Sequence, residues 1–123
     1  MQVNEITFED ARPIDGYGPG FFRVANEVIE GPIILTSTSL VSWQGYEDPS
    51  PLLNLAEEID VILIGTGTEM RPIPSEMRSK LEAAGIGVEF MATPPACRTF
   101  NVLMAEGRRI AAALLPVQAA ATN

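Results

Sequence analysis

The loop Gly65-Thr66-Gly67-Thr68, followed by Arg71, has the residue types that bind small anions. Its glycines let a ligand approach the backbone, its threonines offer hydroxyl groups, and a guanidinium can pair bidentately with a carboxylate or phosphate. A dinucleotide-binding loop would have a third glycine in place of Met70 and a helix beginning at once. Three interpretations therefore stay open: a nucleotide site, a site for a small anion or other ligand, and a structural turn, which the spacing favours.

Cys97 and Arg98 are the second pair of residues with potential chemistry. We expect them one turn into a helix, where the positive helix end and the neighbouring guanidinium would lower the pKa of the thiol. The spacing to Phe100 and Met104 also puts Cys97 on or near an apolar stripe, and free cysteine is usually buried. Cys97 is thus the one candidate nucleophile, and it lacks an activating base. Arg98 is a candidate for binding a ligand or a partner, or for a surface ion pair.

Composition narrows the chemistry further. The chain has no histidine, which excludes a Ser-His or Cys-His triad and a histidine metal site. Its carboxylates show no spacing typical of a metal cage or a glycosidase pair, so we expect no metal and no cofactor. Sixteen acidic against eight basic residues give a net charge of -8, which opposes nucleic-acid binding. These observations favour a protein that is not an enzyme, but they do not exclude one.

Segments that target or anchor proteins are not evident. The N-terminus lacks the basic and apolar regions of a secretory signal. The longest apolar run, residues 110–117, is well below the roughly 20 residues that span a bilayer. One cysteine excludes an internal disulfide and fits a reducing compartment. We expect a cytoplasmic protein that does not insert into a membrane.

The first half of the chain has the signals of antiparallel β structure. Alternating apolar residues predict strands, and clusters of glycine, proline and aspartate predict turns. The expected elements are an outer strand at 3–8, a turn-rich loop at 15–20, a meander of 21–25, 28–29 and 33–38, a strand at 40–44 bearing Trp43, and a helix at 52–59.

The second half alternates strands with helices. The wholly apolar run 61–64 predicts a central strand covered on both faces. A helix begins near Pro74 and ends at Gly85, a strand follows at 86–90, and Thr93 supplies a hydroxyl N-cap for a second helix that ends at Gly107. A last strand covers 109–115. Two such units on short connections favour a mostly parallel sheet in one domain, residues 1–117, with a frayed tail at 118–123.

Several of these segments resemble a known family of small α/β domains, which includes the mitochondrial assembly factor 3 of respiratory complex I. The resemblance extends over nearly the whole chain and includes the glycines at 31, 65 and 67. Its most specific parts are Gly87-Val88-Glu89-Phe90-Met91-Ala92-Thr93, Ala96 to Leu103 and Glu106 to Leu114.

The resemblance implies a three-layer fold around a mixed, mostly parallel central sheet, with an additional small antiparallel β layer from the N-terminal third. It also implies a bacterial, non-catalytic protein-binding domain, assembly-factor-like, whose partner is a subunit of a membrane complex. The alternative is a small enzyme or ligand-binding domain in which the Gly65–Thr68 loop, Arg71 and Arg98 converge on an anion near Cys97. A third hypothesis is a homo-oligomer. Whether the two arginines enter one pocket would distinguish the first two.

Overall fold

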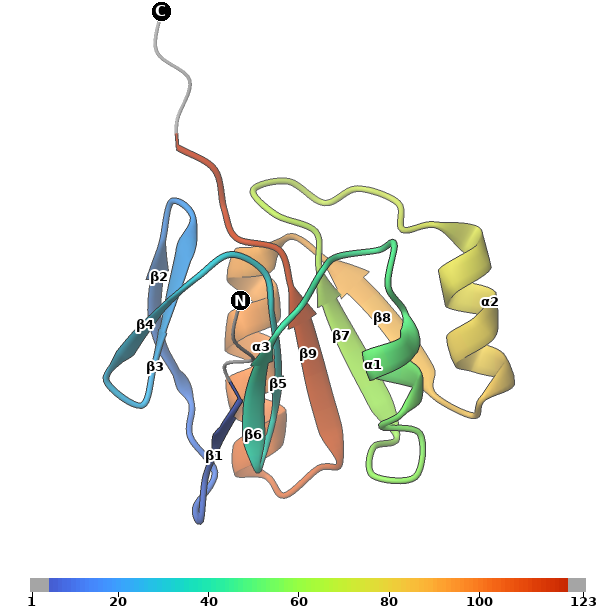
Figure 1. Ribbon diagram of the computed structural model, residues 1–123, viewed down its shortest axis with the longest axis horizontal. Coiled ribbons are helices and arrows are strands. Elements are labelled where there is room, and N and C mark those ends of the chain that lie inside the picture. The colour runs from blue at the N-terminus through green and yellow to red at the C-terminus, as the bar shows by residue number, and fades with distance from the viewer. Residues whose placement is uncertain (1–4, 120–123) are drawn as a thin grey trace, which may run out of the picture.

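The apolar run predicted to be central forms β7 (Val61–Gly65), an interior strand in the computed structural model, which describes residues 5–119 (Figure 1). Ile62 and Ile64 point to one layer and Leu63 to the other, and all three are buried. β7 pairs in parallel with β8 (Gly87–Met91) and β9 (Ile110–Leu114). A strand covered on both faces has no solvated side, which explains its continuous apolar sequence.

In the described part of the chain, the central sheet has six strands in the order β1-β6-β5-β9-β7-β8. Its other members are β1 (Ile6–Thr7), β5 (Ile33–Thr36) and β6 (Ser39–Ser42), all joined by antiparallel pairs. The mixed sheet is therefore confirmed, but its parallel part is limited to β9, β7 and β8. More strand pairs are antiparallel than we predicted. The reason is that β5, which is buried along its whole length, pairs with β9 and is not part of the N-terminal meander.

The predicted small antiparallel layer consists of β2 (Ile14–Gly18), β3 (Phe21–Val24) and β4 (Glu27–Glu30). The prediction of a loop at 15–20 was largely wrong, because most of this segment belongs to β2. The turn itself is confined to Pro19 and Gly20, and Gly20 has a φ of 81°, which favours glycine. Gly16 and Gly18 interrupt the alternation of side chains from which a strand is predicted. The strand forms nevertheless, because pairing with β3 provides its hydrogen bonds.

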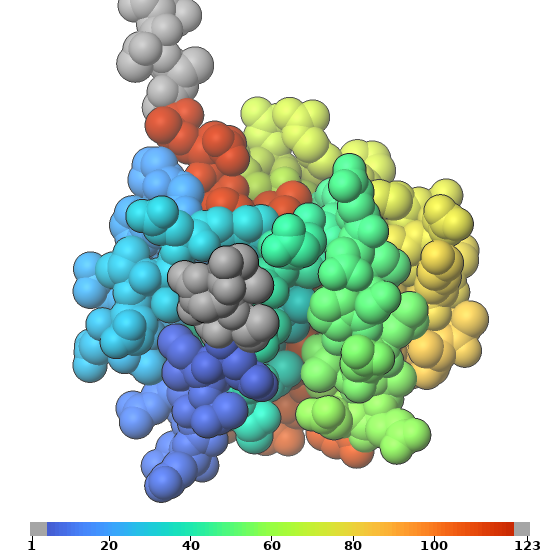
Figure 2. All heavy atoms as spheres, in the orientation of Figure 1, coloured from blue at the N-terminus to red at the C-terminus, as the bar shows by residue number. Residues whose placement is uncertain are grey.

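Within residues 5–119, three helices complete the layers. α3 (Thr93–Ala105) and the small sheet cover one face of the central sheet, and α1 (Ser50–Leu53) and α2 (Ser75–Ala83) cover the other. The predicted helix ends are confirmed, since Gly85 and Gly107 both have positive φ values just after α2 and α3. The helix expected at 52–59 is shorter, because 54–58 form tight turns. In Figure 2 the N-terminal strands and the α1–α2 layer lie on opposite sides of one view.

α3 is tied to the small sheet by one side chain. The amide of Asn101 donates to the carbonyl of Ile14 at 3.0 Å and its oxygen accepts the Ile14 N–H at 2.8 Å. Asn101 thus takes the place of a neighbouring strand at the outer edge of β2, so the small sheet and α3 form one layer.

The predictions for the two ends of the chain are tested only in part. β1 is an outer strand, as predicted, although residues 3 and 4 lie outside the described part. In the predicted tail, the Gln118 N–H donates to Thr68 Oγ1 at 2.8 Å, and residues 120–123 lie outside the described residues. The division into a domain at 1–117 and a tail stays a prediction. Within residues 5–119, no helix is long and apolar enough to cross a membrane.

Candidate functional site

The Gly65–Thr68 loop lies where the carboxyl ends of β7, β8 and β9 meet, the edge at which open α/β sheets usually bind ligands. In Figure 1 it lies beside the segment that follows β9, as the hydrogen bond from Leu115 N to Gly65 O at 2.9 Å requires. Loop and segment line an open cavity of about 380 Å³, with Arg71 among its lining residues. The position therefore agrees with the ligand hypothesis.

Thr93 holds this loop, which the sequence did not predict. The N-cap of α3 is Ala92, and Thr93 is the fully buried first residue of the helix. Its hydroxyl accepts the Gly67 N–H at 2.8 Å and donates to the Leu115 carbonyl at 2.6 Å. Its own N–H donates to the Gly67 carbonyl at 2.8 Å. One residue thus joins the loop, the helix and the segment after β9.

The prediction of a capping role failed for a physical reason. A capping hydroxyl accepts an N–H group from the first helical turn, but Pro94 and Pro95 have none, and the N–H of Ala96 donates to the Ala92 carbonyl at 3.1 Å. The Thr93 hydroxyl is therefore available for partners outside the helix. The two prolines are visible in the sequence, but the partners of the Ala96 N–H and of the Thr93 hydroxyl are not.

The threonine hydroxyls of the loop form hydrogen bonds within the protein. Thr66 is buried, and its hydroxyl donates to the Glu69 carbonyl at 2.6 Å and accepts the Arg71 N–H at 3.1 Å. Thr68 accepts the N–H of Gln118. The exposed Arg71 guanidinium lies 3.4 Å from the Glu69 carboxylate, which offsets its charge. The loop is a clamped turn, and residues 65–71 have no net charge because Glu69 balances Arg71.

Arg98 lies elsewhere, on the outer face of α3. Together with Thr99, Val102 and Leu103 it lines a shallow depression of about 230 Å³. The described residues that line the loop cavity do not include Arg98, so the structure does not bring the two arginines into one pocket. The geometry required by the anion hypothesis as first stated is absent from residues 5–119.

Cys97 is on the inner face of α3, with 4% of its surface exposed. Burial raises the pKa of its thiol from 9.0 to about 11, against the opposing effect of the Arg98 charge. The helix end and the guanidinium therefore do not activate this thiol, because desolvation is the larger effect. In the part of the chain that the structure describes, no group of three His, Cys, Asp or Glu side chains could hold a metal ion.

We predict that Cys97 labels slowly. The pKa difference between 9.0 and about 11 lowers the thiolate population near pH 8. Iodoacetamide should modify the native chain about a hundredfold more slowly than the chain in denaturant. Because the folded pKa is raised, the stability due to the protonated thiol is fully present below pH 9.0 and is lost as the pH rises through about 11. Rapid labelling of the native chain, followed by mass spectrometry, would contradict this assignment.

Fold and site together define a three-layer α/β domain with a clamped loop at the carboxyl edge of its parallel strands. The chain belongs to the family described as "Protein of unknown function (DUF498/DUF598)", whose profile matches residues 14–115. This membership confirms the resemblance identified from the sequence.

Individual proteins are similar to this chain over most of its length. An uncharacterised protein of Rhodobacter capsulatus is 42% identical over 98% of this chain and 97% of its own. The human NADH dehydrogenase [ubiquinone] 1 alpha subcomplex assembly factor 3 is 36% identical over 84% of this chain, which spans 60% of that protein. A crystal structure described as an outer membrane protein of Bartonella henselae has a TM-score of 0.81 and 40% identity, covering 90% of this chain and 99% of that one.

Proposed function

We propose that this chain is a non-catalytic, assembly-factor-like domain that binds a protein partner on the outer face of α3. The relative named as an assembly factor of NADH dehydrogenase supports this proposal, since it aligns with most of the chain. By the same analogy the partner is a subunit of a membrane respiratory complex, which the domain meets from the cytoplasm without entering the bilayer. Fold alone would not support this step, because one fold serves many functions.

The observation that carries the proposal is the outer face of α3. Val102 is 56% exposed, and it lies one helical turn after Arg98 and beside the half-buried Leu103. Arg98 forms no ion pair within the described residues, so its guanidinium can bind a carboxylate of the partner. An apolar centre with an arginine at its rim is the usual composition of a protein interface.

We predict that Val102→Asp strongly reduces partner capture. The tagged chain would be recovered from mildly solubilised cells, and bound proteins would be identified by mass spectrometry. The native chain should recover respiratory-complex subunits in near-stoichiometric amounts, and Val102→Asp and Arg98→Glu should each reduce recovery about tenfold or more, because each places a repulsive charge in the interface. Met70→Asp is the matched control, since Met70 is 65% exposed and lies between β7 and α2, not on α3.

The control separates a surface effect from a general loss of solubility. Equal recovery by the native chain and Val102→Asp would contradict the proposed interface. Recovery of the chain alone, with a solution mass of a dimer or larger, would favour a homo-oligomer instead.

A second candidate function is supported by the cavity at the loop. Its volume of about 380 Å³ and its place at the carboxyl edge suit a small anion held by Arg71. Inorganic phosphate would then shift the amide resonances of Gly67 and Thr68, and Arg71→Ala would remove those shifts. Such shifts in a chain that captures no protein would favour ligand binding over the assembly role.

A further inference from the structure

Two strands have an open edge on the same side of the molecule. β1 pairs only with β6, and β4 pairs only with β3, within the residues that the structure describes. In an edge strand every second residue directs its N–H and C=O groups outward, where they can pair with another chain. The two open edges border the same two cavities.

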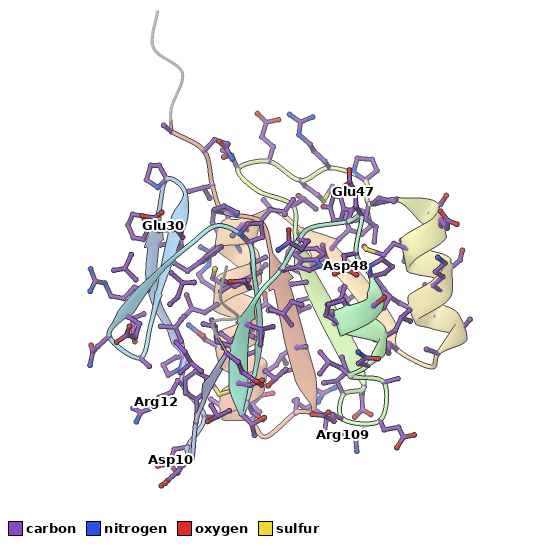
Figure 3. The ribbon with its side chains drawn as sticks, viewed as in Figure 1. Asp10, Arg12, Glu30, Glu47, Asp48 and Arg109 are labelled. Atoms are coloured by element: carbon purple, nitrogen blue, oxygen red, sulfur yellow. The ribbon has the colours of Figure 1, made fainter. Side chains whose placement is uncertain are left out.

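We refer to the two cavities together as the groove, because they share lining residues. One, of about 520 Å³, is lined by all of β4 together with Glu5, Ile6 and Ser42. The other, of about 510 Å³, is lined by residues 6–10 with Arg12, Ala25 and Glu27. Ile6 and Glu27 line both, so the cavities adjoin. In Figure 3 Glu30 lies toward the upper end of this side of the molecule, and Asp10 and Arg12 lie toward its lower end.

The groove has an apolar floor and an acidic rim. Ile6, Phe8 and Ile29 are half-buried and pack against the core. The carboxylates that line it are Glu5, Glu9, Asp10, Glu27 and Glu30, against the single cation Arg12. None of these charged groups forms an ion pair among the described residues. A ligand that fits would alternate cations with apolar residues, as an extended strand can do.

We propose that this groove binds an extended basic segment of a partner protein, which adds to the open edge of β4. Backbone pairing would hold the segment, and its apolar side chains would lie on the face of Ile29. Its cations would lie on the opposite face beside Glu30, while Glu27 adds negative charge at the start of the strand. A second copy of this chain fits poorly, because edge-to-edge pairing of β4 would bring like carboxylates together. The groove shares no lining residue with the α3 depression, so this inference goes beyond the proposed function.

The test uses the full chain and a capped peptide of alternating lysine and valine. Titration followed by NMR should give saturable binding, with the largest amide shifts in residues 27–30. Two forms of the peptide have methylated backbone nitrogens, one on every valine and the other on every lysine. Both keep the charge of the peptide, and each blocks the backbone N–H groups along one of its two edges. The form that blocks the edge facing β4 should bind about tenfold or more weakly.

Charge-reversal variants separate the groove from the overall charge. Glu27→Lys with Glu30→Lys should weaken peptide binding about tenfold. Glu58→Lys with Glu106→Lys has the same net charge at exposed positions outside the groove, and it should leave binding within about twofold.

Several results would overturn the proposal. These are equal weakening by both double variants, equal binding of both methylated peptides, and the absence of binding. Absence of peptide binding, with dimerisation that depends on Glu27 and Glu30, would assign the edge to a second copy of the chain.

Discussion

Gly65→Ala should destabilise the protein by about 3 kcal/mol, because it adds a side chain to a fully packed junction. A Cβ at this position would lie 2.8 Å from Leu114 Cδ2, 2.8 Å from Thr93 Oγ1 and 3.2 Å from the Thr93 Cα. The Thr93 contacts cannot relax independently, since its hydroxyl and backbone already bond the loop and the segment after β9. Urea denaturation followed by circular dichroism would measure the change in the free energy of unfolding.

Gly16→Ala is the control for this prediction. Gly16 is also in a strand, and a Cβ there meets no atom within 4 Å. Its replacement should change the free energy of unfolding by about 0.5 kcal/mol or less, because no packed atom has to move. If Gly65→Ala were as mild as this control, the close approach of β7 to α3 would be disproved.

Thr93→Val should cost about 3 kcal/mol of folding free energy while preserving the shape of the side chain. The substitution removes one acceptor and one donor at a fully buried position, leaving the buried N–H of Gly67 and the carbonyl of Leu115 without their partner. An unsatisfied buried polar group loses its hydration without gaining a hydrogen bond, so its cost exceeds the value of an ordinary hydrogen bond.

The local consequence of Thr93→Val can be measured separately. Exchange of the Gly67 amide hydrogen should accelerate about a hundredfold, because that amide loses its acceptor. Thr93→Ser keeps the hydroxyl and should cost only about 1 kcal/mol for the lost methyl group. Similar losses in the two variants would show that packing, and not the hydroxyl, holds the loop.

The parts of the fold that follow local rules were predictable. The buried run of β7 requires only apolar residues in succession, and the ends of α2 and α3 require only a residue that tolerates positive φ, as Gly85 and Gly107 do. β2 was missed, because glycines at 16 and 18 are poor strand formers and its hydrogen bonds come from β3 and Asn101.

The place of the Gly65–Thr68 loop in the fold was predictable, whereas the residues that surround it were not. The Gly65–Thr68 loop lies at the expected edge because parallel strands align their carboxyl ends. Arg98 was grouped with this loop on the basis of its charge alone. Its helix starts at that edge, yet the side chain lines a depression on the outer face of α3. Helical phase places neighbouring residues on different faces, and Cys97, one residue earlier, is buried.

The sequence by itself determined where most elements begin and end, that strands alternate with helices in the second half of the chain, and that no histidine-based chemistry is available. These properties depend on residue types and on periodicities of a few residues. Only the tertiary structure decided that β5 pairs with β9, that the Thr93 hydroxyl joins Gly67 to Leu115, and that the groove borders the edges of β1 and β4. Each of these contacts joins residues more than a dozen positions apart, and local patterns do not encode which distant partner a hydroxyl or a strand edge will meet.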